Sequence, residues 1–348
     1  MVRLGAMGDI LHALPAVTAL RLAHPRWVID WVVEPRWQPL LAGPAYAADS
    51  EPPSADNRLI DRLYLAPAKK WGESPLSRET IHELKVLRRD LRAGAYDAVI
   101  DFQGAIRSAA IGRISGAPRL IGESSPREWG ARWLFNERIA TSGAHVIEQD
   151  VELAAAVVGD NLSPVHPWLP VDPAAETWAN GILPPTADQK AVLINPGAGW
   201  GAKCWPTDRY AAVTQGLIDR GLRVLVNAGP GEQPLAEAIF QAIGSAATPL
   251  TCSLQQLIAL TRRVALVVAG DTGPLHLACA LVRPVLGIYG PTDPSRNGPF
   301  GTRFKVLRSP NSRRDHTRYA EPEAGLLTIE PQDVLHAADQ LLAPEAAP

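Results

Sequence analysis

The sequence predicts an α/β protein made of two domains, each with a parallel β-sheet covered by helices on both faces. Apolar runs of strand length alternate with helical patterns along the chain, which is the order that parallel sheets require. Many of these runs are continuous rather than alternating, as expected for strands buried on both faces. The length of 348 residues favours two domains over one.

The predicted strands fall into two groups with helical patterns between them. In the first half they are Val2–Leu4, Val28–Val33, Leu59–Leu65, Asp97–Phe102 and Arg119–Ile121. In the second half they are Ala191–Ile194, Leu222–Val226, Val264–Ala269 and Val285–Tyr289. Helical periodicity is clearest over Ile81–Leu91, Tyr210–Asp219 and Leu254–Leu260.

A proline-rich stretch separates the two groups. Six prolines lie between residues 163 and 190, where the apolar periodicity weakens, and such a stretch marks a domain boundary. We expect an amino-terminal domain over residues 1–165 and a carboxy-terminal domain over 166–330, although Ala174–Gly181 could already be a helix of the second. Residues 331–348 are expected to form an amphipathic helix and a frayed tail, and this helix could pack back on the amino-terminal domain.

The composition narrows the possible functions. The net charge of −2 gives no overall field that would favour nucleic acid, so we expect no nucleic-acid partner. The three cysteines are far apart and form no CxxC pair, which suits a reducing cytoplasm and argues against a disulfide framework or structural zinc. No apolar run approaches the roughly 18 residues of a membrane span, and we expect no signal peptide.

Four loops that follow strands hold the candidate site, because ligands of open α/β sheets bind beyond the carboxyl ends of the strands. The first loop, after Val2–Leu4, contains two glycines that permit a tight turn, and it ends on Asp9. Since Pro15 is unfavourable deep inside a helix, we expect the helix to begin near His12 and to leave Asp9 in the turn. Asp9 could instead cap that helix. The spacing is not GxGxxG, which weakens a dehydrogenase interpretation.

The second and third loops follow the first two strands of the second half. Loop 195–206 has three glycines at alternate positions and one cation, Lys203, which could meet a phosphate or could be an exposed surface lysine. It is not a P-loop, because GxxxxGK[ST] is absent. Loop 227–232 ends on Glu232, which could accept hydrogen bonds from ribose hydroxyls or could cap the helix over 233–243.

The fourth loop, Gly270–His276, opens a helix. Asp271 or Thr272 can cap it, and Pro274 is tolerated in its first turn. Free N–H groups and the positive end of the dipole make such a helix start an anion site, which His276 could face unless it is only structural. Together the loops predict a nucleotide diphosphate bound mainly by the second domain, with Asp9 facing it from the first across a cleft.

The chain resembles the bacterial ADP-heptose:lipopolysaccharide heptosyltransferases of glycosyltransferase family 9 over nearly its whole length, most closely the subgroup that adds the first inner-core heptose. The segments that carry the resemblance keep the family's order and are Met7–Pro15, Ile29–Glu34, Tyr96–Gly104, Arg107–Ala109, Ser125–Glu128, Lys203–Pro206, Asp271–His276 and Tyr289–Pro294. The resemblance implies a GT-B fold, with two Rossmann-like domains facing across a cleft, and an inverting transfer without a metal or cofactor.

The resemblance also implies the substrates and the surroundings. The donor would be ADP-L-glycero-β-D-manno-heptose and the acceptor an anionic, lipid-linked Kdo residue of Kdo-lipid A. We expect a cytoplasmic enzyme with transient contact to the inner-membrane surface. A related heptosyltransferase that adds a later heptose, or a nucleotide-binding α/β protein of another class, remains an alternative.

Site residues follow from the same resemblance, position by position. Asp9 is expected to be the catalytic base, and Lys203 is expected to act beside the donor phosphates. The implied donor-binding residues are Gly8, Ala198, Gly199, Lys203, Glu232, Cys252, Asp271, Thr272, Gly273 and His276. The implied acceptor-binding residues are Lys69, Lys70, Gln103 and Arg127.

Overall fold

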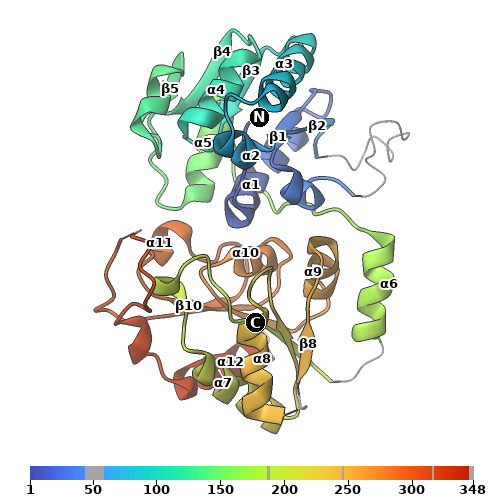
Figure 1. Ribbon diagram of the computed structural model, residues 1–348, viewed down its shortest axis with the longest axis vertical. Coiled ribbons are helices and arrows are strands. Elements are labelled where there is room, and N and C mark those ends of the chain that lie inside the picture. Colours follow the sequence, from blue (N-terminus) through green and yellow to red (C-terminus); the bar gives the residue numbers. More distant parts are fainter. Residues whose placement is uncertain (44–58, 186–188, 245–246, 316, 345–348) are drawn as a thin grey trace. The chain divides into compact units, whose positions relative to one another are not determined.

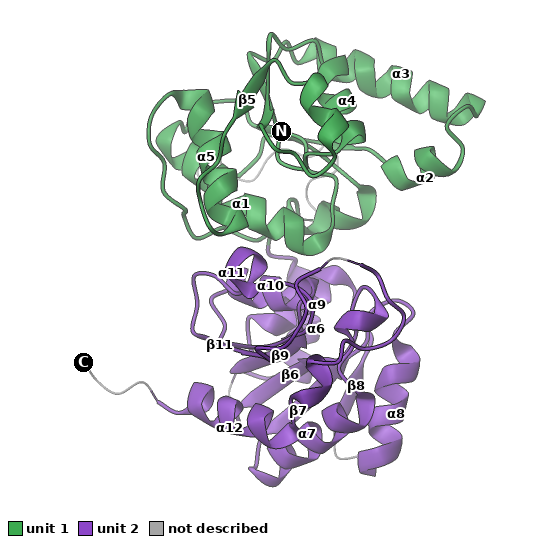
Figure 2. Cartoon of the chain, turned by 90° about the vertical axis from the view of Figure 1, so that its left-hand side faces the viewer, with its two compact units in different colours: residues 1–170 green, residues 171–348 purple. Residues whose placement is uncertain are grey.

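The chain divides into two compact units, Met1–Pro170 and Val171–Pro348 (Figure 2). The structure is a computed structural model that describes residues 1–43, 59–185, 189–244, 247–315 and 317–344. Each unit contains parallel strands and its own helices, so the predicted α/β class is confirmed. The division falls after Pro170, slightly beyond the position expected from the proline-rich stretch.

The sheet of unit 1 is parallel throughout. Its strands are β1 (Asp30–Val33), β2 (Arg62–Leu65), β3 (Ala98–Asp101), β4 (Arg119–Glu123) and β5 (Glu137–Ile139). The first segment of the chain lies between β1 and β3, because Val2 bridges to both Val32 and Asp101. The resulting order is β2-β1-(Val2)-β3-β4-β5, with the predicted strand Val2–Leu4 at its centre as a short bridging segment.

Helices cover both faces of this sheet (Figure 1). On one face α1 (Met7–Ala23) packs against α5 (Val146–Val158). On the other face α3 (Arg78–Ala93) packs against α4 (Ile106–Ile114). The other helical segments among the described residues of this unit are short and are η1 (Pro35–Leu40), α2 (Ala68–Glu73) and η3 (Trp129–Trp133).

The start of α1 corrects the sequence prediction. The helix begins at Met7 instead of near His12, and it continues through Pro15. A proline inside a helix removes one backbone hydrogen bond and costs about 3 kcal/mol in an isolated helix. Here the side chains from Ile10 to Arg21 are buried, since α1 packs against α5, and this burial outweighs the local cost.

Unit 2 contains a six-stranded parallel sheet. Its strands are β6 (Ala191–Asn195), β7 (Arg223–Asn227), β8 (Thr248–Leu250), β9 (Leu266–Gly270), β10 (Val285–Tyr289) and β11 (Phe304–Arg308). The order is β11-β10-β9-β6-β7-β8, so the chain moves outward on one side of β6 and then returns to the other side at β9. This is the doubly wound Rossmann order, with its switch point between β6 and β9.

Helices of unit 2 also form two layers. One face carries α7 (Thr207–Asp219), α8 (Gln233–Ile243) and α12 (Pro331–Leu342). The other carries α6 (Pro173–Ile182), α9 (Leu254–Thr261) and α10 (Gly273–Ala280), while α11 (Pro294–Asn297), η4 (Gly201–Lys203) and η6 (Leu326–Thr328) are short. The tail helix α12 belongs to unit 2 and packs on α7, whereas the sequence also allowed packing on the amino-terminal half. Residues 345–348 of the expected tail lie outside the described residues.

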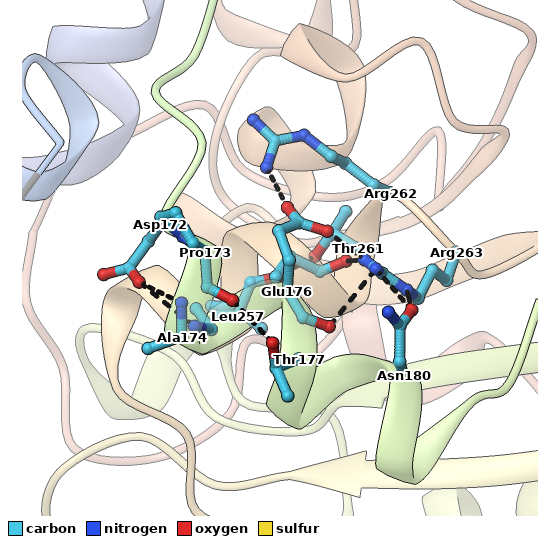
Figure 3. Close-up of polar contacts among 12 residues, drawn as sticks. Asp172, Pro173, Ala174, Glu176, Thr177, Asn180, Leu257, Thr261, Arg262 and Arg263 are labelled. Carbon is cyan, nitrogen blue, oxygen red and sulfur yellow. Dashed lines mark hydrogen bonds and ion pairs between the residues drawn. The ribbon is translucent and has the colours of Figure 1, made fainter.

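The helix expected over 174–181 forms as α6 and is fixed to α9 by polar contacts (Figure 3). Asp172 caps it by accepting hydrogen bonds from two amides of its first turn, at 2.9 and 3.1 Å. The Glu176 carboxylate pairs with both Arg262 and Arg263 at 2.6 Å, and Arg263 also donates to Asn180. These contacts attach the proline-rich stretch to unit 2 from its first helix onward.

Candidate active site

The site residues expected from the sequence lie at the carboxyl edges of the two sheets. In unit 2, the loops after β6 and β9 flank the switch point and carry Lys203 and Asp271. In unit 1, the corresponding position lies between the Val2 segment and β3. The first turn of α1, which follows the Val2 segment, carries Asp9, and the loop after β3 carries Gln103. Switch points are where ligands of doubly wound sheets bind, because neighbouring loops diverge there.

Lys203 and Asp271 form a buried ion pair across the switch point of unit 2. The Lys203 ammonium contacts the Asp271 carboxylate, and it also donates to the Asp271 carbonyl at 3.3 Å. Their side chains are only 10% and 8% exposed, which excludes the interpretation of Lys203 as an exposed surface lysine. His276 Nε2 lies 3.2 Å from the other carboxylate oxygen of Asp271. Burial alone would raise the pKa of Asp271, but His276 and Lys203 outweigh it and hold that pKa well below its usual range.

Trp200 lies beside this ion pair. The Lys203 ammonium is 4.2 Å from the centre of its ring, and the Arg318 guanidinium is 5.5 Å from the same ring. Both distances are within the range of cation–π attraction. The indole N–H of Trp200 is buried without a hydrogen-bond partner among the described residues. Trp200 was not among the predicted site residues, although its place inside the glycine-rich loop was a usable signal.

A second segment crosses the glycine-rich loop. The Ala202 amide donates to the Tyr319 carbonyl at 3.0 Å, and the Glu323 amide donates to the Ala202 carbonyl at 3.2 Å. A Cβ at Gly201 would lie 1.5 Å from the Ala320 carbonyl oxygen, so only glycine fits there. Residues 319–323, which we call the strap, therefore hold the loop that carries Lys203, and sequence reasoning missed them.

Glu232 connects the loops after β6 and β7. Its carboxylate accepts from the Gly229 amide at 2.9 Å and lies where a Cβ of Gly197 would be, about 2 Å away. It makes no side-chain hydrogen bond to α8, so the capping interpretation is wrong. The last residues of β6 and β7 are also joined, because the Asn227 side-chain amide donates to Asn195 Oδ1 at 2.9 Å.

The remaining donor candidates lie along the same edge. Thr272 is the N-cap residue of α10, but its hydroxyl donates to the Gly270 carbonyl at 3.3 Å and makes no capping hydrogen bond. Gly273 is the first residue of that helix. Ala198 is half-buried, and Gly199 is exposed, with open space where a Cβ would project. Cys252 follows β8, and burial raises the pKa of its thiol to about 11, so the thiol is protonated and apolar at neutral pH.

Asp9 of unit 1 lies in the first turn of α1. One carboxylate oxygen accepts from the Ala6 amide at 3.1 Å, and the other lies 3.2 Å from the Arg3 guanidinium. Asp9 therefore does cap the start of α1, but with only one of its two carboxylate oxygens. The Asp9 side chain is 36% exposed while that of Arg3 is 8% exposed, so the carboxylate reaches solvent and its cation does not.

A buried network holds the residues next to Asp9. Arg3 also donates to the Phe102 carbonyl, and Gln103 Oε1 accepts from the Leu4 amide at 2.7 Å. Asp101 accepts from the Gln103 amide at 2.7 Å and from the Ser108 hydroxyl at 2.9 Å. Burial raises the pKa of Asp101 to about 6, and these donors offset only part of that rise. Gly8, the second residue of α1, is partly exposed beside Asp9.

The three basic acceptor candidates differ in their surroundings. Lys70 lies in α2, and its ammonium contacts Glu79 at 2.7 Å and Glu83 at 3.3 Å. Hydrogen bonding to Glu79 in particular raises the pKa of Lys70. Lys69 and Arg127 are exposed, and neither side chain forms an ion pair with another residue described in the structure. Lys69 follows β2 and Arg127 follows β4, so both lie at the same edge of the sheet as Gln103.

Two negative findings concern the described residues only. No helix among them is long and apolar enough to cross a membrane. Within the same residues, no group of three histidine, cysteine, aspartate or glutamate side chains is arranged to hold a metal ion.

Known proteins resemble the chain in sequence and in fold. A family model described as glycosyltransferase family 9 (heptosyltransferase) matches residues 84–326. Lipopolysaccharide heptosyltransferase 1 of Escherichia coli K12 is 30% identical over 315 residues, which cover 89% of this chain and 93% of that protein. The solved structure titled E. coli heptosyltransferase WaaC with ADP has a TM-score of 0.77 at 27% identity, covering 98% of each chain. WaaC with ADP-2-deoxy-2-fluoro heptose has a TM-score of 0.74 at 28% identity, covering 97% of this chain and 98% of that one.

Proposed function

Because this chain belongs to glycosyltransferase family 9, we propose that it moves heptose from ADP-L-glycero-β-D-manno-heptose to a Kdo residue of Kdo-lipid A during assembly of the lipopolysaccharide inner core. The observation that carries this proposal is the buried Lys203–Asp271–His276 network at the switch point of unit 2. The relatives solved with ADP and with an ADP-heptose analogue support the choice of donor.

Unit 2 would bind the donor. A diphosphate needs donors that are already oriented, and the Lys203 ammonium is held between Asp271 and the ring of Trp200. The start of α10, with Thr272 and Gly273, supplies amides and a positive dipole end that the Thr272 side chain does not occupy. The amide of Gly199 lies in a part of the loop open enough for close approach of a phosphate, and the half-buried Ala198 precedes it.

The nucleoside would extend along the same edge of the sheet. Glu232 keeps a carboxylate at the end of β7, where it can accept hydrogen bonds from ribose hydroxyls. Cys252 offers a neutral, polarizable side chain for the face of the adenine. His276 would orient Asp271, and Asp271 in turn keeps the Lys203 side chain in place.

Unit 1 would bind the acceptor and supply the base. Asp9 takes the proton from the attacking Kdo hydroxyl as its oxygen bonds to the anomeric carbon. The bond from that carbon to the β-phosphate oxygen breaks on the opposite face, so the configuration inverts and ADP leaves. General-base catalysis of this kind is worth roughly 10²–10⁴-fold. Lys203 and the start of α10 would stabilise the charge that develops on ADP.

The anionic acceptor requires cations on unit 1. Lys69 and Arg127 are the stronger candidates, because the charge of Lys70 is already balanced by two glutamates. The hydrogen bond from the Leu4 amide to Gln103 Oε1 would fix the Gln103 side chain, which leaves its N–H₂ group free to donate to the sugar. We expect the enzyme to work in the cytoplasm and to contact the anionic inner-membrane surface transiently.

Mass spectrometry of a defined reaction tests the proposal. The full chain is incubated with ADP-heptose and Kdo-lipid A, and the products are analysed for one added heptose and for released ADP. The proposal expects both, with no product when Kdo-lipid A is omitted. Transfer only to an acceptor that already carries heptose would instead assign a later step to this enzyme, and no transfer to either acceptor would contradict the proposal.

A further inference from the structure

An exposed pair of tryptophans stands out on unit 1. Trp129 and Trp133 are 62% and 64% exposed, and the neighbouring Ile106 is 50% exposed. We propose that this tryptophan face, defined as Trp129, Trp133, Ile106 and the arginines around them, is a docking surface for an anionic phospholipid bilayer.

The rings of Trp129 and Trp133 pack against each other. They pack edge to face with centroids 5.4 Å apart at the two ends of η3. The Arg132 guanidinium lies 5.5 Å from the ring centre of Trp129 and 5.7 Å from that of Trp133, while Arg138 lies 5.9 Å from Trp133. Neither arginine forms an ion pair with a carboxylate among the described residues, and a guanidinium group over an aromatic face keeps its charge. Arg138 is exposed, whereas Arg132 is half-buried and its Nε is buried without a hydrogen-bond partner in the described part of the chain.

The segment below the rings is fixed to the sheet. The Glu128 amide donates to the Gly104 carbonyl at 2.8 Å, and the Glu128 carboxylate accepts from the Ile106 amide at 2.8 Å. Ala131 and Phe135 are buried in the core of unit 1. A Cβ at Gly130 would lie 2.9 Å from the end of Ile106, so the loop and α4 are in close contact. The tryptophans are thus held outward by a packed support.

The charge around the rings is positive. Arg107, Arg127, Arg132 and Arg138 lie on or beside the segment. The nearby acids without a basic partner in the described part of the chain are Glu128, which binds the start of α4, and Glu123, which accepts from the Thr141 hydroxyl at 3.1 Å, so the four arginines outnumber them. Guanidinium groups bind phosphates in a two-pronged geometry, and indole rings favour the headgroup level of a bilayer. A phospholipid surface with anionic headgroups satisfies both groups at once, whereas a neutral protein surface would satisfy only the rings.

The inference rests on the proposed function for one point only, that the acceptor is attached to a lipid. Within unit 1, η3 and Arg127 both follow β4, so the tryptophan face lies beside a candidate acceptor loop. Docking there would bring the bilayer to the carboxyl edge of the acceptor-binding sheet.

Vesicle flotation tests the surface without any sugar chemistry. The full chain is mixed with vesicles of phosphatidylcholine alone or of phosphatidylcholine with phosphatidylglycerol, at low and at high salt. We expect binding only to the phosphatidylglycerol vesicles, with loss at high salt. The double variant Trp129→Ser, Trp133→Ser should bind about tenfold more weakly or worse, and Arg107→Gln with Arg138→Gln should weaken binding about tenfold. The matched controls Trp168→Ser, at another exposed tryptophan, and Arg88→Gln should bind like the unmodified chain.

Specific outcomes overturn the inference. Unchanged binding of either double variant would do so, and so would equal binding to vesicles without phosphatidylglycerol. The Trp129→Ser, Trp133→Ser variant should also transfer heptose to detergent-solubilised acceptor at the normal rate, and loss of that reaction would assign the rings to acceptor binding instead. If the unmodified chain binds vesicles but transfers no heptose, the proposed function fails while the docking surface stands. Should the serine variant not fold, the arginine variant carries the same test.

Discussion

The two units share a strand order but place their charges in opposite ways at the switch point. In unit 2 the cation Lys203 and its partner Asp271 are both buried, at 10% and 8% exposure, so the ion pair is a fixed part of the site. In unit 1 the cation Arg3 is buried at 8% exposure while its partner Asp9 reaches solvent at 36%. One scaffold therefore presents an oriented positive site in one unit and an accessible carboxylate in the other.

This difference in side-chain exposure suits unit 2 to diphosphate binding and unit 1 to proton transfer. A buried ammonium held by a low-pKa carboxylate cannot reorganise much, which suits stabilisation of a diphosphate. A carboxylate that must accept a proton has to reach its substrate, and the capping bond from Ala6 with the Arg3 contact orients it without burying it. We therefore expect substitutions at the two edges to affect different steps, ADP binding in unit 2 and proton transfer in unit 1.

The largest effect is expected from Asp9→Asn. The amide can still accept the hydrogen bond from Ala6, so α1 should keep its start, but it cannot take a proton. We expect the turnover number to fall by roughly 10²–10⁴-fold in a transfer assay that follows ADP release. Turnover within twofold of the unmodified enzyme would remove Asp9 from the mechanism.

Gly201→Ala should disturb unit 2 selectively. The new methyl group would meet the Ala320 carbonyl and push the strap away from the loop that carries Lys203. Overpacking of this kind costs about 1–3 kcal/mol, which urea unfolding can detect. Gly199→Ala is the matched control for stability, since nothing lies within 4 Å of the position its new methyl group would take. Equal stability of the two variants would show that the strap does not hold the loop.

The stability of unit 1 should depend on pH because Asp101 exchanges a proton. Its pKa of about 6 in the folded chain lies above the ordinary value of 3.8, so the folded state holds this proton more tightly than the unfolded state. Stability is therefore lost as pH rises from about 4 to about 6. Urea unfolding of Asp101→Asn should show an advantage over the unmodified chain that grows across this window. A difference that is constant or shrinks with rising pH would contradict the assignment.

The smallest effect is expected at the lysines of α2. Exposed charges are worth about 0.2–1 kcal/mol, so Lys69→Gln should raise the KM for the acceptor by at most about fivefold and leave kcat unchanged. Lys70→Gln should have less effect, because its charge is already paired with Glu79 and Glu83. Lys85→Gln on α3 is the control. A larger effect at Lys70 than at Lys69 would reverse this ranking.

The sequence predicted what depends on local pattern. Continuous apolar runs placed most strands of both sheets, and glycines after strands identified the loops at the switch points. The three strands that were missed are β5, β8 and β11, which are either three residues long or partly exposed, so their burial pattern gives no clear period. The start of α1 was misplaced because Pro15 is unfavourable only for a helix that lacks tertiary packing.

Contacts between distant residues could not be predicted from the sequence. Lys203 and Asp271 were each selected, but their ion pair joins residues 68 positions apart and required the strand order. The strap depends on Tyr319 meeting Ala202, which no periodicity encodes. Arg3 was overlooked as a partner of Asp9, although a charged residue inside an apolar first strand was a usable signal.

Calorimetric titration of ADP tests most directly whether the diphosphate site belongs to unit 2 and is independent of Asp9. For Lys203→Gln we expect binding weakened about tenfold or more, since a hydrogen bond to a charged group contributes about 1.5–3 kcal/mol. For Asp9→Asn we expect an ADP affinity within about twofold of the unmodified chain, because the Asp9 carboxylate is negatively charged and does not attract a diphosphate. Normal affinity in Lys203→Gln, or an equal loss in both variants, would contradict the assignment of the diphosphate site to unit 2.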